Sequence, residues 1–149
     1  MKLLKLAETE NLEFFSADTT SAVKLPLYLS RVSAGFPSPA EDYIERFLDL
    51  NEHLIKHPAA TFYVKVQGDS MKDANLNEGD LLIVDRSLEP KNNNIIVCHL
   101  DGGFTVKRFF KENDTIVLYP ANNKFNPIKI SKDQQFEIFG VVTYTIHKS

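Results

Sequence analysis

Ser70 is the residue in this sequence whose type and neighbours best suit covalent chemistry. It stands in the tetrapeptide Gly68-Asp69-Ser70-Met71, between the alternating apolar run TFYVKV and a polar turn. A serine hydroxyl becomes a nucleophile only when a base removes its proton. Taken alone, a serine that follows a glycine at the end of a strand is more simply part of a turn, so a base has to be found elsewhere in the chain.

A lysine can be that base if burial keeps its amine neutral, because desolvation lowers the pKa of an amine toward the working range. Two lysines stand inside apolar strand-like runs: Lys65 in FYVKV and Lys107 in FTVKRFF. Alternation places Lys65 opposite its apolar neighbours and therefore toward solvent. Lys107 shares a face with Thr105 and Phe109, which makes it the better candidate for a buried base. An ordinary exposed strand lysine remains the alternative.

The other reactive side chains predict neither a metal site nor a thiol nucleophile. The four histidines are scattered, and no carboxylate or cysteine stands near them at metal-ligand spacing. Cys98 and His99 are neighbours in a strand-like run, so their side chains point to opposite faces and cannot meet. Cys98 is therefore expected to be buried and inert. The chain also lacks the glycine-rich phosphate-binding motifs and the H-E-x-x-H motif, and no cofactor is expected.

Length and composition predict one globular domain without a membrane span. The 149 residues are 43% hydrophobic, which is enough for a core of ordinary size. A net charge of −3 argues against charge-driven binding to nucleic acid, and direct sequence-specific DNA binding is not expected. The single cysteine excludes an internal disulfide, and the apolar start MKLLKL breaks at Glu8, too early for a signal peptide. A cytoplasmic location is expected.

The residues before Thr61 predict an arm followed by one helix. Residues 1–34 show no sustained period beyond a short strand-like patch, VKLPLYL, and are expected to form an extended N-terminal arm. The run Ser38-Pro39-Ala40-Glu41 matches a capping box with proline at the first helical position. Apolar residues then recur at helical spacing until His57-Pro58, so one amphipathic helix is expected over about 39–56.

From Thr61 onward the pattern changes to short strands separated by turns. The apolar runs are TFYVKVQ, LLIVD, NIIVCHL, FTVKRFF, TIVLY, PIKI and EIFGVVTYTI. Turn residues stand between the runs, as in Asn77-Glu78-Gly79-Asp80, and Asp101-Gly102 is the strongest hairpin signal. The expected fold is α+β and mainly antiparallel β, with a partly barrel-like sheet.

Several motifs, taken in order, resemble the LexA-like self-cleaving serine peptidase family and in particular its UmuD-type SOS mutagenesis proteins. The motifs are GFPSPAEDYIE, the serine motif GDSM followed by NEGDLLIVD, the lysine motif FTVKRF and the closing FGVV. They extend from Gly35 to Val142 in the order and spacing of the family. The resemblance implies a LexA/UmuD-like β-rich catalytic domain over residues 35–149, after an N-terminal arm over residues 1–34 that self-cleavage removes.

The resemblance also implies a role for each site residue. In this family the serine of the G-x-S-M motif attacks a peptide bond in the protein's own arm, and a lysine on a later strand is the base. On this chain Ser70 would be the nucleophile, Lys107 the general base and Ala34-Gly35 the scissile bond. The residue types suit these roles, because Gly68 allows close backbone approach and the turn can direct the N–H of Ser70 toward an oxyanion.

The partners that the resemblance implies are a second copy of the chain in a homodimer, a RecA filament on single-stranded DNA that stimulates cleavage, and a UmuC-like Y-family DNA polymerase. The shortened dimer would be a subunit of this error-prone translesion polymerase. Three alternatives stay open. The first is a LexA-like repressor, which shares the serine and lysine, although an arm of 34 residues is too short for a helix-turn-helix domain with a linker. The second is a signal peptidase, which also uses serine and lysine but would need a membrane anchor. A non-catalytic β interaction module would hold Ser70 and Lys107 far apart.

Overall fold

The computed structural model describes residues 2–8, 12–18, 24–28, 44–67, 75–120 and 126–149. Every strand predicted from Thr61 onward is present. These strands are β5 (Thr61–Val66), β6 (Leu81–Asp85), β7 (Ile95–Leu100), β8 (Gly103–Glu112), β9 (Thr115–Tyr119), β10 (Ile128–Lys129) and β11 (Phe136–Ile146). The predicted hairpin at Asp101-Gly102 joins β7 to β8, and both turn residues have positive φ, at 48° and 91°, as a two-residue hairpin turn requires.

Before Thr61 the structure describes four more strands and two short helices. They are β1 (Lys2–Glu8), β2 (Leu12–Asp18), β3 (Lys24–Tyr28), β4 (Ile44–Asp49), α1 (Leu50–Leu54) and the 3-10 helix η2 (Pro58–Ala60). Nine strands form one sheet in the order β1-β2-β5-β6-β11-β7-β8-β9-β10, while β3 pairs with β4 alone. All of these pairings are antiparallel, which confirms the mainly antiparallel β fold.

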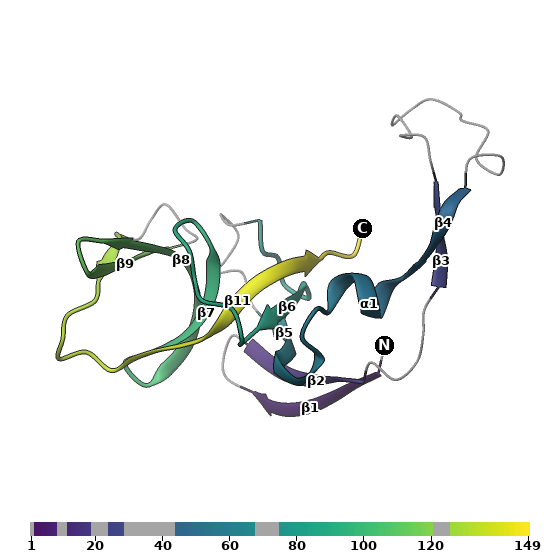
Figure 1. Ribbon diagram of the computed structural model, residues 1–149. Coiled ribbons are helices and arrows are strands. Elements are labelled where there is room, and N and C mark those ends of the chain that lie inside the picture. Colours follow the sequence, from purple (N-terminus) through teal and green to yellow (C-terminus); the bar gives the residue numbers. More distant parts are fainter. Residues whose placement is uncertain (1, 9–11, 19–23, 29–43, 68–74, 121–125) are drawn as a thin grey trace.

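Alternation along the strands buries apolar side chains on both faces of the nine-stranded sheet. One buried cluster, which we name the inner cluster, comprises Leu12, Phe14, Val64, Val66, Leu76, Leu82, Val84, Val97 and Val106. A second, the β7–β9 cluster, comprises Ile96, Cys98, Phe109, Leu118 and Val141. Figure 1 shows the sheet curling where β7, β8 and β9 meet, and this curl is the barrel-like part of the fold.

The long strand β11 joins the two halves of the sheet, since it pairs with β6 along one edge and with β7 along the other. Its register with β7 shifts between Ile138 and Gly140. A Cβ atom at Gly140 would lie 2.7 Å from Cγ1 of Val84 and 3.1 Å from the carbonyl oxygen of Asp85. Only glycine permits β11 to approach β6 this closely, which explains the glycine of the FGVV motif.

The N-terminal segment is extended, as expected, but it belongs to the sheet and is not a free arm. Strands β1 and β2 form a hairpin, and β2 pairs with β5. The side chains of Leu12 and Phe14 are buried, at 0% and 5% exposure. The sequence pattern did not predict this pairing, because Phe15 interrupts the alternation of apolar and polar residues in β2 and the partner strand β5 is distant in the chain.

The helix expected over about 39–56 is much shorter in the structure. The capping box at Ser38-Glu41 lies outside the described residues, and residues 44–49 form β4 instead of helix. The strand-like patch VKLPLYL is confirmed as β3, and its pairing with β4 satisfies backbone groups that a helix would have satisfied internally. Figure 1 shows this two-stranded ribbon extending away from the nine-stranded sheet.

Asp49 starts the helix that does form. Its side chain accepts a hydrogen bond of 3.0 Å from the backbone N–H of Asn51, so Asp49 is the N-cap of α1. The sequence carries a signal for this start, because Asp49 and Glu52 have the spacing of a capping box. The predicted helix therefore extended too far toward the N-terminus, since residues 44–49 form β4.

Candidate active site

Lys107 lies on β8 with its side chain half-buried, whereas Lys65 on β5 is exposed, as predicted. Lys107 is directly opposite Ile96 in the register of β7 and β8. Alternation then places it on the same face as Cys98 and Phe109, both of which belong to the buried β7–β9 cluster. Of the two strand lysines, Lys107 is therefore the one that is partly buried, as predicted, and its role as a base stays a prediction.

Burial lowers the pKa of the Lys107 amine, and a charge on the nearby Cys98 thiol would act in the opposite direction. Among the described residues, no Asp or Glu forms an ion pair with Lys107. No described carboxylate therefore offsets the desolvation of the ammonium, and the amine is shifted toward the neutral form that a general base needs.

Cys98 is completely buried, and burial raises the pKa of its thiol to about 12, with Lys107 opposing this rise. The thiol is therefore neutral at physiological pH and is not a nucleophile. His99 points to the other face, where its ring lies 5.0 Å from the ring of Phe104. The prediction that Cys98 and His99 cannot meet is confirmed. The proximity of Cys98 to Lys107 was not predicted, although the two-residue turn at Asp101-Gly102 sets the strand register that places them on one face.

Ser70 and the Ala34-Gly35 bond lie outside the described residues, so their roles remain predictions. The order of the sheet sets a condition for the predicted pair of Ser70 and Lys107. Strands β6, β11 and β7 lie between β5, which precedes Ser70, and β8, which carries Lys107. Four strand spacings amount to about 19 Å in a flat sheet. A meeting of the two side chains therefore has to span the separation between β5 and β8.

Asp80 holds together the two ends of the segment that contains Ser70. The N–H of Val66 donates to the carbonyl of Asp80 at 2.9 Å, and the N–H of Gly79 donates to the carbonyl of Val66 at 2.8 Å. The buried Asp80 carboxylate accepts from the N–H of Asn77 at 2.8 Å and lies 2.6 Å from Nδ1 of His147. The turn at Asn77-Asp80 was predicted from its residues, but the contact of Asp80 with His147 near the C-terminus was not.

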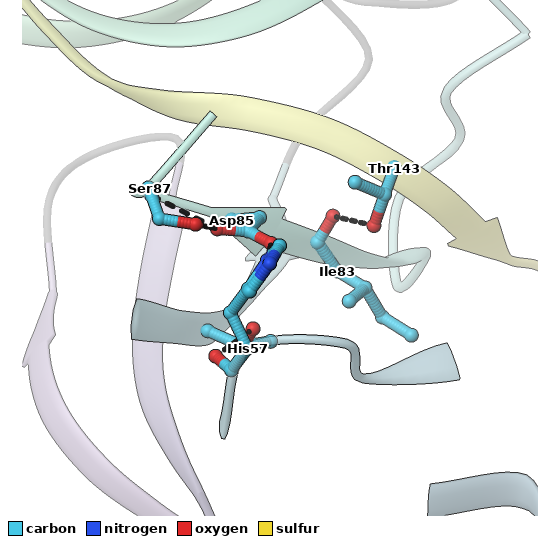
Figure 2. A network of polar contacts seen from close by, with 6 residues as sticks. His57, Ile83, Asp85, Ser87 and Thr143 are labelled. Atoms are coloured by element: carbon cyan, nitrogen blue, oxygen red, sulfur yellow. Dashed lines mark hydrogen bonds and ion pairs between the residues drawn. The ribbon is translucent and has the colours of Figure 1, made fainter. Parts of the chain in front are cut away.

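A second polar centre surrounds Asp85 at the end of β6 (Figure 2). One carboxylate oxygen lies 2.6 Å from Nδ1 of His57, and the other accepts hydrogen bonds from the hydroxyl and the N–H of Ser87 at 2.6 and 2.9 Å. Burial alone would raise the pKa of Asp85, but the hydrogen bonds from Ser87 and His57 outweigh burial and lower it. The carboxylate lies between the imidazole and the hydroxyl, so His57 is not placed to deprotonate Ser87.

A cavity of about 540 Å³ borders this polar centre. Its lining includes His57, Asp85, Leu88 and Tyr144, but not Lys107. Thr143, also in the lining, donates a hydrogen bond of 3.2 Å to the carbonyl of Ile83, which ties β11 to β6 (Figure 2). The network therefore joins elements of the fold and contains no pairing of a nucleophile with a base.

In the described part of the chain, no group of three or more His, Cys, Asp or Glu side chains could hold a metal ion. None of its helices is long and apolar enough to cross a membrane.

Comparisons with known proteins agree with the motifs. The Peptidase S24-like family model matches residues 26–143. Protein SamA of Salmonella typhimurium is 46% identical over 124 residues, which cover 83% of this chain and 86% of that protein. Protein MucA of Escherichia coli is 40% identical over 134 residues, which cover 89% of this chain and 91% of that protein. The LexA repressor of Psychromonas ingrahamii is 40% identical over 123 residues, which cover 82% of this chain and 58% of that repressor.

The matched range contains every residue that the motifs assigned to chemistry. Ala34, Gly35, Ser70 and Lys107 all fall within residues 26–143. The resemblance to UmuD-type proteins is confirmed by relatives of this type, SamA, MucA and ImpA, which are 40–46% identical over most of the chain. With a family model matched over most of its length and these relatives beside it, the chain belongs to the Peptidase S24-like family.

Proposed function

We propose that this chain is a self-cleaving serine peptidase of SOS mutagenesis, in which Ser70 cuts the Ala34-Gly35 bond with Lys107 as general base. The observation that carries the proposal is the environment of Lys107. Its amine is half-buried beside an apolar cluster, its pKa is lowered by burial, and it has no ion-pair partner among the described residues. A lysine in such surroundings suits proton transfer better than it suits stability.

The reaction begins when the neutral amine of Lys107 takes the hydroxyl proton of Ser70 while Oγ attacks the carbonyl carbon of Ala34. The C–N bond to Gly35 then breaks, the Lys107 ammonium returns the proton to the leaving amine, and the arm remains as an ester on Ser70. Water, deprotonated by the same amine, hydrolyses this ester. Because the scissile bond is part of the same chain, attack takes place at a high effective concentration.

The proposed cellular setting follows from the UmuD-type resemblance. A RecA filament on single-stranded DNA would stimulate the cut in the cytoplasm. The shortened chain, residues 35–149, would form a homodimer and act as a subunit of an error-prone translesion polymerase of the UmuC-like Y family. The similarity to SamA, MucA and ImpA over more than four fifths of this chain supports this setting.

A repressor function is the second candidate, because the chain is 40% identical to a LexA repressor. The chain spans 58% of that repressor's length. The net charge of −3 gives no support to binding along a DNA backbone. Binding of the purified chain to operator DNA at physiological salt would favour the repressor, whereas stimulated cleavage without DNA binding favours the polymerase subunit.

The proposal is tested by incubating the purified full chain from neutral to alkaline pH, alone and with RecA filaments, and measuring fragment masses. We expect two fragments that separate between Ala34 and Gly35. Ser70→Ala and Lys107→Ala should stay intact, while Lys65→Ala is the matched control, since it removes an exposed strand lysine, and should be cut at the wild-type rate. Cutting of Ser70→Ala would contradict the mechanism.

The cut position has its own test. A fragment that starts at any residue other than Gly35 would contradict the assigned bond. Replacing Gly35 with glutamate should block cutting, because a charged side chain would have to enter a narrow, desolvated cleft. Unhindered cutting of this variant would likewise remove the assignment while leaving the roles of Ser70 and Lys107 intact.

A further inference from the structure

The edge of β5 that faces away from β6 is occupied by β2. Five residue pairs connect the two strands, from Leu12 opposite Val66 to Ser16 opposite Phe62. The other edge of β5 pairs with β6. If the β1–β2 hairpin left, β5 would present a row of unpaired N–H and C=O groups, a surface to which another strand can add.

The hairpin is also anchored by its apolar side chains. Leu12 and Phe14 belong to the buried inner cluster. The ring of Phe14 lies 4.8 Å from that of Phe104 and 5.2 Å from that of Phe139. Phe15 packs against the other face of the sheet. The hairpin therefore contributes core contacts on both sides of β5, and its departure would expose them.

A polar contact ties the hairpin to the root of the segment that contains Ser70. The carboxylate of Glu13 on β2 accepts a hydrogen bond from the side-chain amide of Gln67 and forms an ion pair of 3.3 Å with Lys5. Gln67 follows β5 directly and precedes Gly68 of the serine motif. The seated hairpin thus lies next to the start of the expected nucleophile segment.

We propose that cutting between Ala34 and Gly35 does not release the arm: the fragment stays bound through the β1–β2 hairpin on β5 and through β3 on β4, and the β5 edge opens only when another extended segment displaces the hairpin. The cut itself rests on the proposed function. The scissile bond lies beyond the end of β2 at Asp18, so cleavage removes the tether without removing any pairing with β5. What is lost is the effective concentration that the tether supplied.

The resident strand defines the partner that this site fits. Leu12 and Phe14 show that an extended segment needs apolar side chains at alternate positions to fill the inner face. A segment that displaces the hairpin must therefore supply apolar side chains at the positions of Leu12 and Phe14, where Phe14 contacts the rings of Phe104 and Phe139.

The test separates retention of the arm from self-cleavage. A recognition sequence for a specific protease is inserted between Ala34 and Gly35 of the Ser70→Ala chain, which is then cut and studied by size-exclusion chromatography and native mass spectrometry. We expect the fragment to co-elute with the domain. Phe14→Ala should weaken retention at least about 100-fold, because a buried aromatic side chain is lost. Leu6→Ala in the same hairpin is the control, since Leu6 is 52% exposed, and it should retain the fragment.

A second measurement keeps the test valid if the Phe14→Ala chain fails to fold. A labelled synthetic peptide of residues 2–28, which includes β3, is added to the cut protein, where it should exchange with the resident fragment, while the same peptide with Phe14→Ala should not. Immediate loss of the fragment from a still-folded domain, or equal competition by the two peptides, would overturn the proposal. If intact chains exchange hairpins with one another, the proposal is overturned, and the strand on the β5 edge comes from a second copy of the chain. Failure of self-cleavage would be seen separately, in the unmodified chain with RecA filaments.

Discussion

Asp85 at the end of β6 is buried and Lys107 on β8 is half-buried, and the surroundings of these two ionisable side chains differ sharply. The side chain of Asp85 is 5% exposed and is hydrogen-bonded to His57 and twice to Ser87. Lys107 is half-buried against apolar residues and has no ion-pair partner among the described residues. The pKa of each group is lowered, but hydrogen bonds are the cause at Asp85 and burial is the cause at Lys107.

For Asp85 the lowered pKa means that hydrogen bonds stabilise the charged carboxylate more than burial destabilises it. For Lys107 it means that burial destabilises the charged ammonium. The first group stays charged and joins segments of the fold, while the second is shifted toward a neutral form that can accept a proton. The comparison teaches that the cause of a pKa shift, and not its direction, separates a structural group from a candidate catalytic one.

The largest expected effect is that of Lys107→Met, which removes the amine and keeps an apolar chain of similar length. Self-cleavage should fall at least about 100-fold, since a general base is lost. Thermal stability should not decrease, because no buried ammonium remains. Lys65→Met, at an exposed position of β5, is the matched control and should leave both quantities unchanged. If Lys107→Met unfolds the protein, Lys107 is structural and the comparison with Asp85 fails.

Asp85→Ala should act mainly on stability. At neutral pH it should lower the free energy of unfolding by about 2 kcal/mol, because the Ser87 and His57 donors lose their acceptor. A folded pKa below the unfolded value gives stability that is present above about pH 4 and is lost as pH falls through the folded pKa. The difference from wild type in denaturant titrations should therefore shrink in acid. Exposed Asp133→Ala is the control, and an equal loss in that variant would contradict a special role for Asp85.

The pH profile of self-cleavage should follow Lys107 and not Asp85. Only the neutral amine accepts the proton of Ser70, so the rate should rise about tenfold per pH unit until the folded pKa of Lys107 is reached. Asp85 is fully charged over this range because its pKa is lowered from an already acidic value. The rate is measured from fragment mass over time; a flat profile from neutral to alkaline pH would indicate another base.

The smallest effect is expected for Cys98→Ala, although Cys98 lies on the same face as Lys107. Cleavage should stay within about twofold of wild type, because the buried thiol is neutral at these pH values and is not used as a nucleophile. Loss of the buried sulfur should lower the free energy of unfolding by about 1 kcal/mol. Loss of cutting without loss of structure would make the Cys98 thiol a participant in the reaction.

Much of the sheet could be predicted from the sequence because its signals are local. Short apolar runs between turn residues mark all strands from Thr61 onward, and Asp101-Gly102 marks a hairpin whose positive φ angles the structure confirms. Alternation also distinguished the half-buried Lys107 from the exposed Lys65. The motifs that placed the chain in its family are likewise contiguous runs of residues.

The tertiary structure decided what depends on distant partners. Residues 44–49 carry helical spacing, but pairing with β3 makes them a strand, and β2 joins the sheet because β5 offers an edge. The contacts of Asp85 with His57 and of Asp80 with His147 connect residues 28 and 67 positions apart. No spacing in the sequence predicts such pairs, because the free energy of a pairing or a buried hydrogen bond depends on which segments the whole fold brings together.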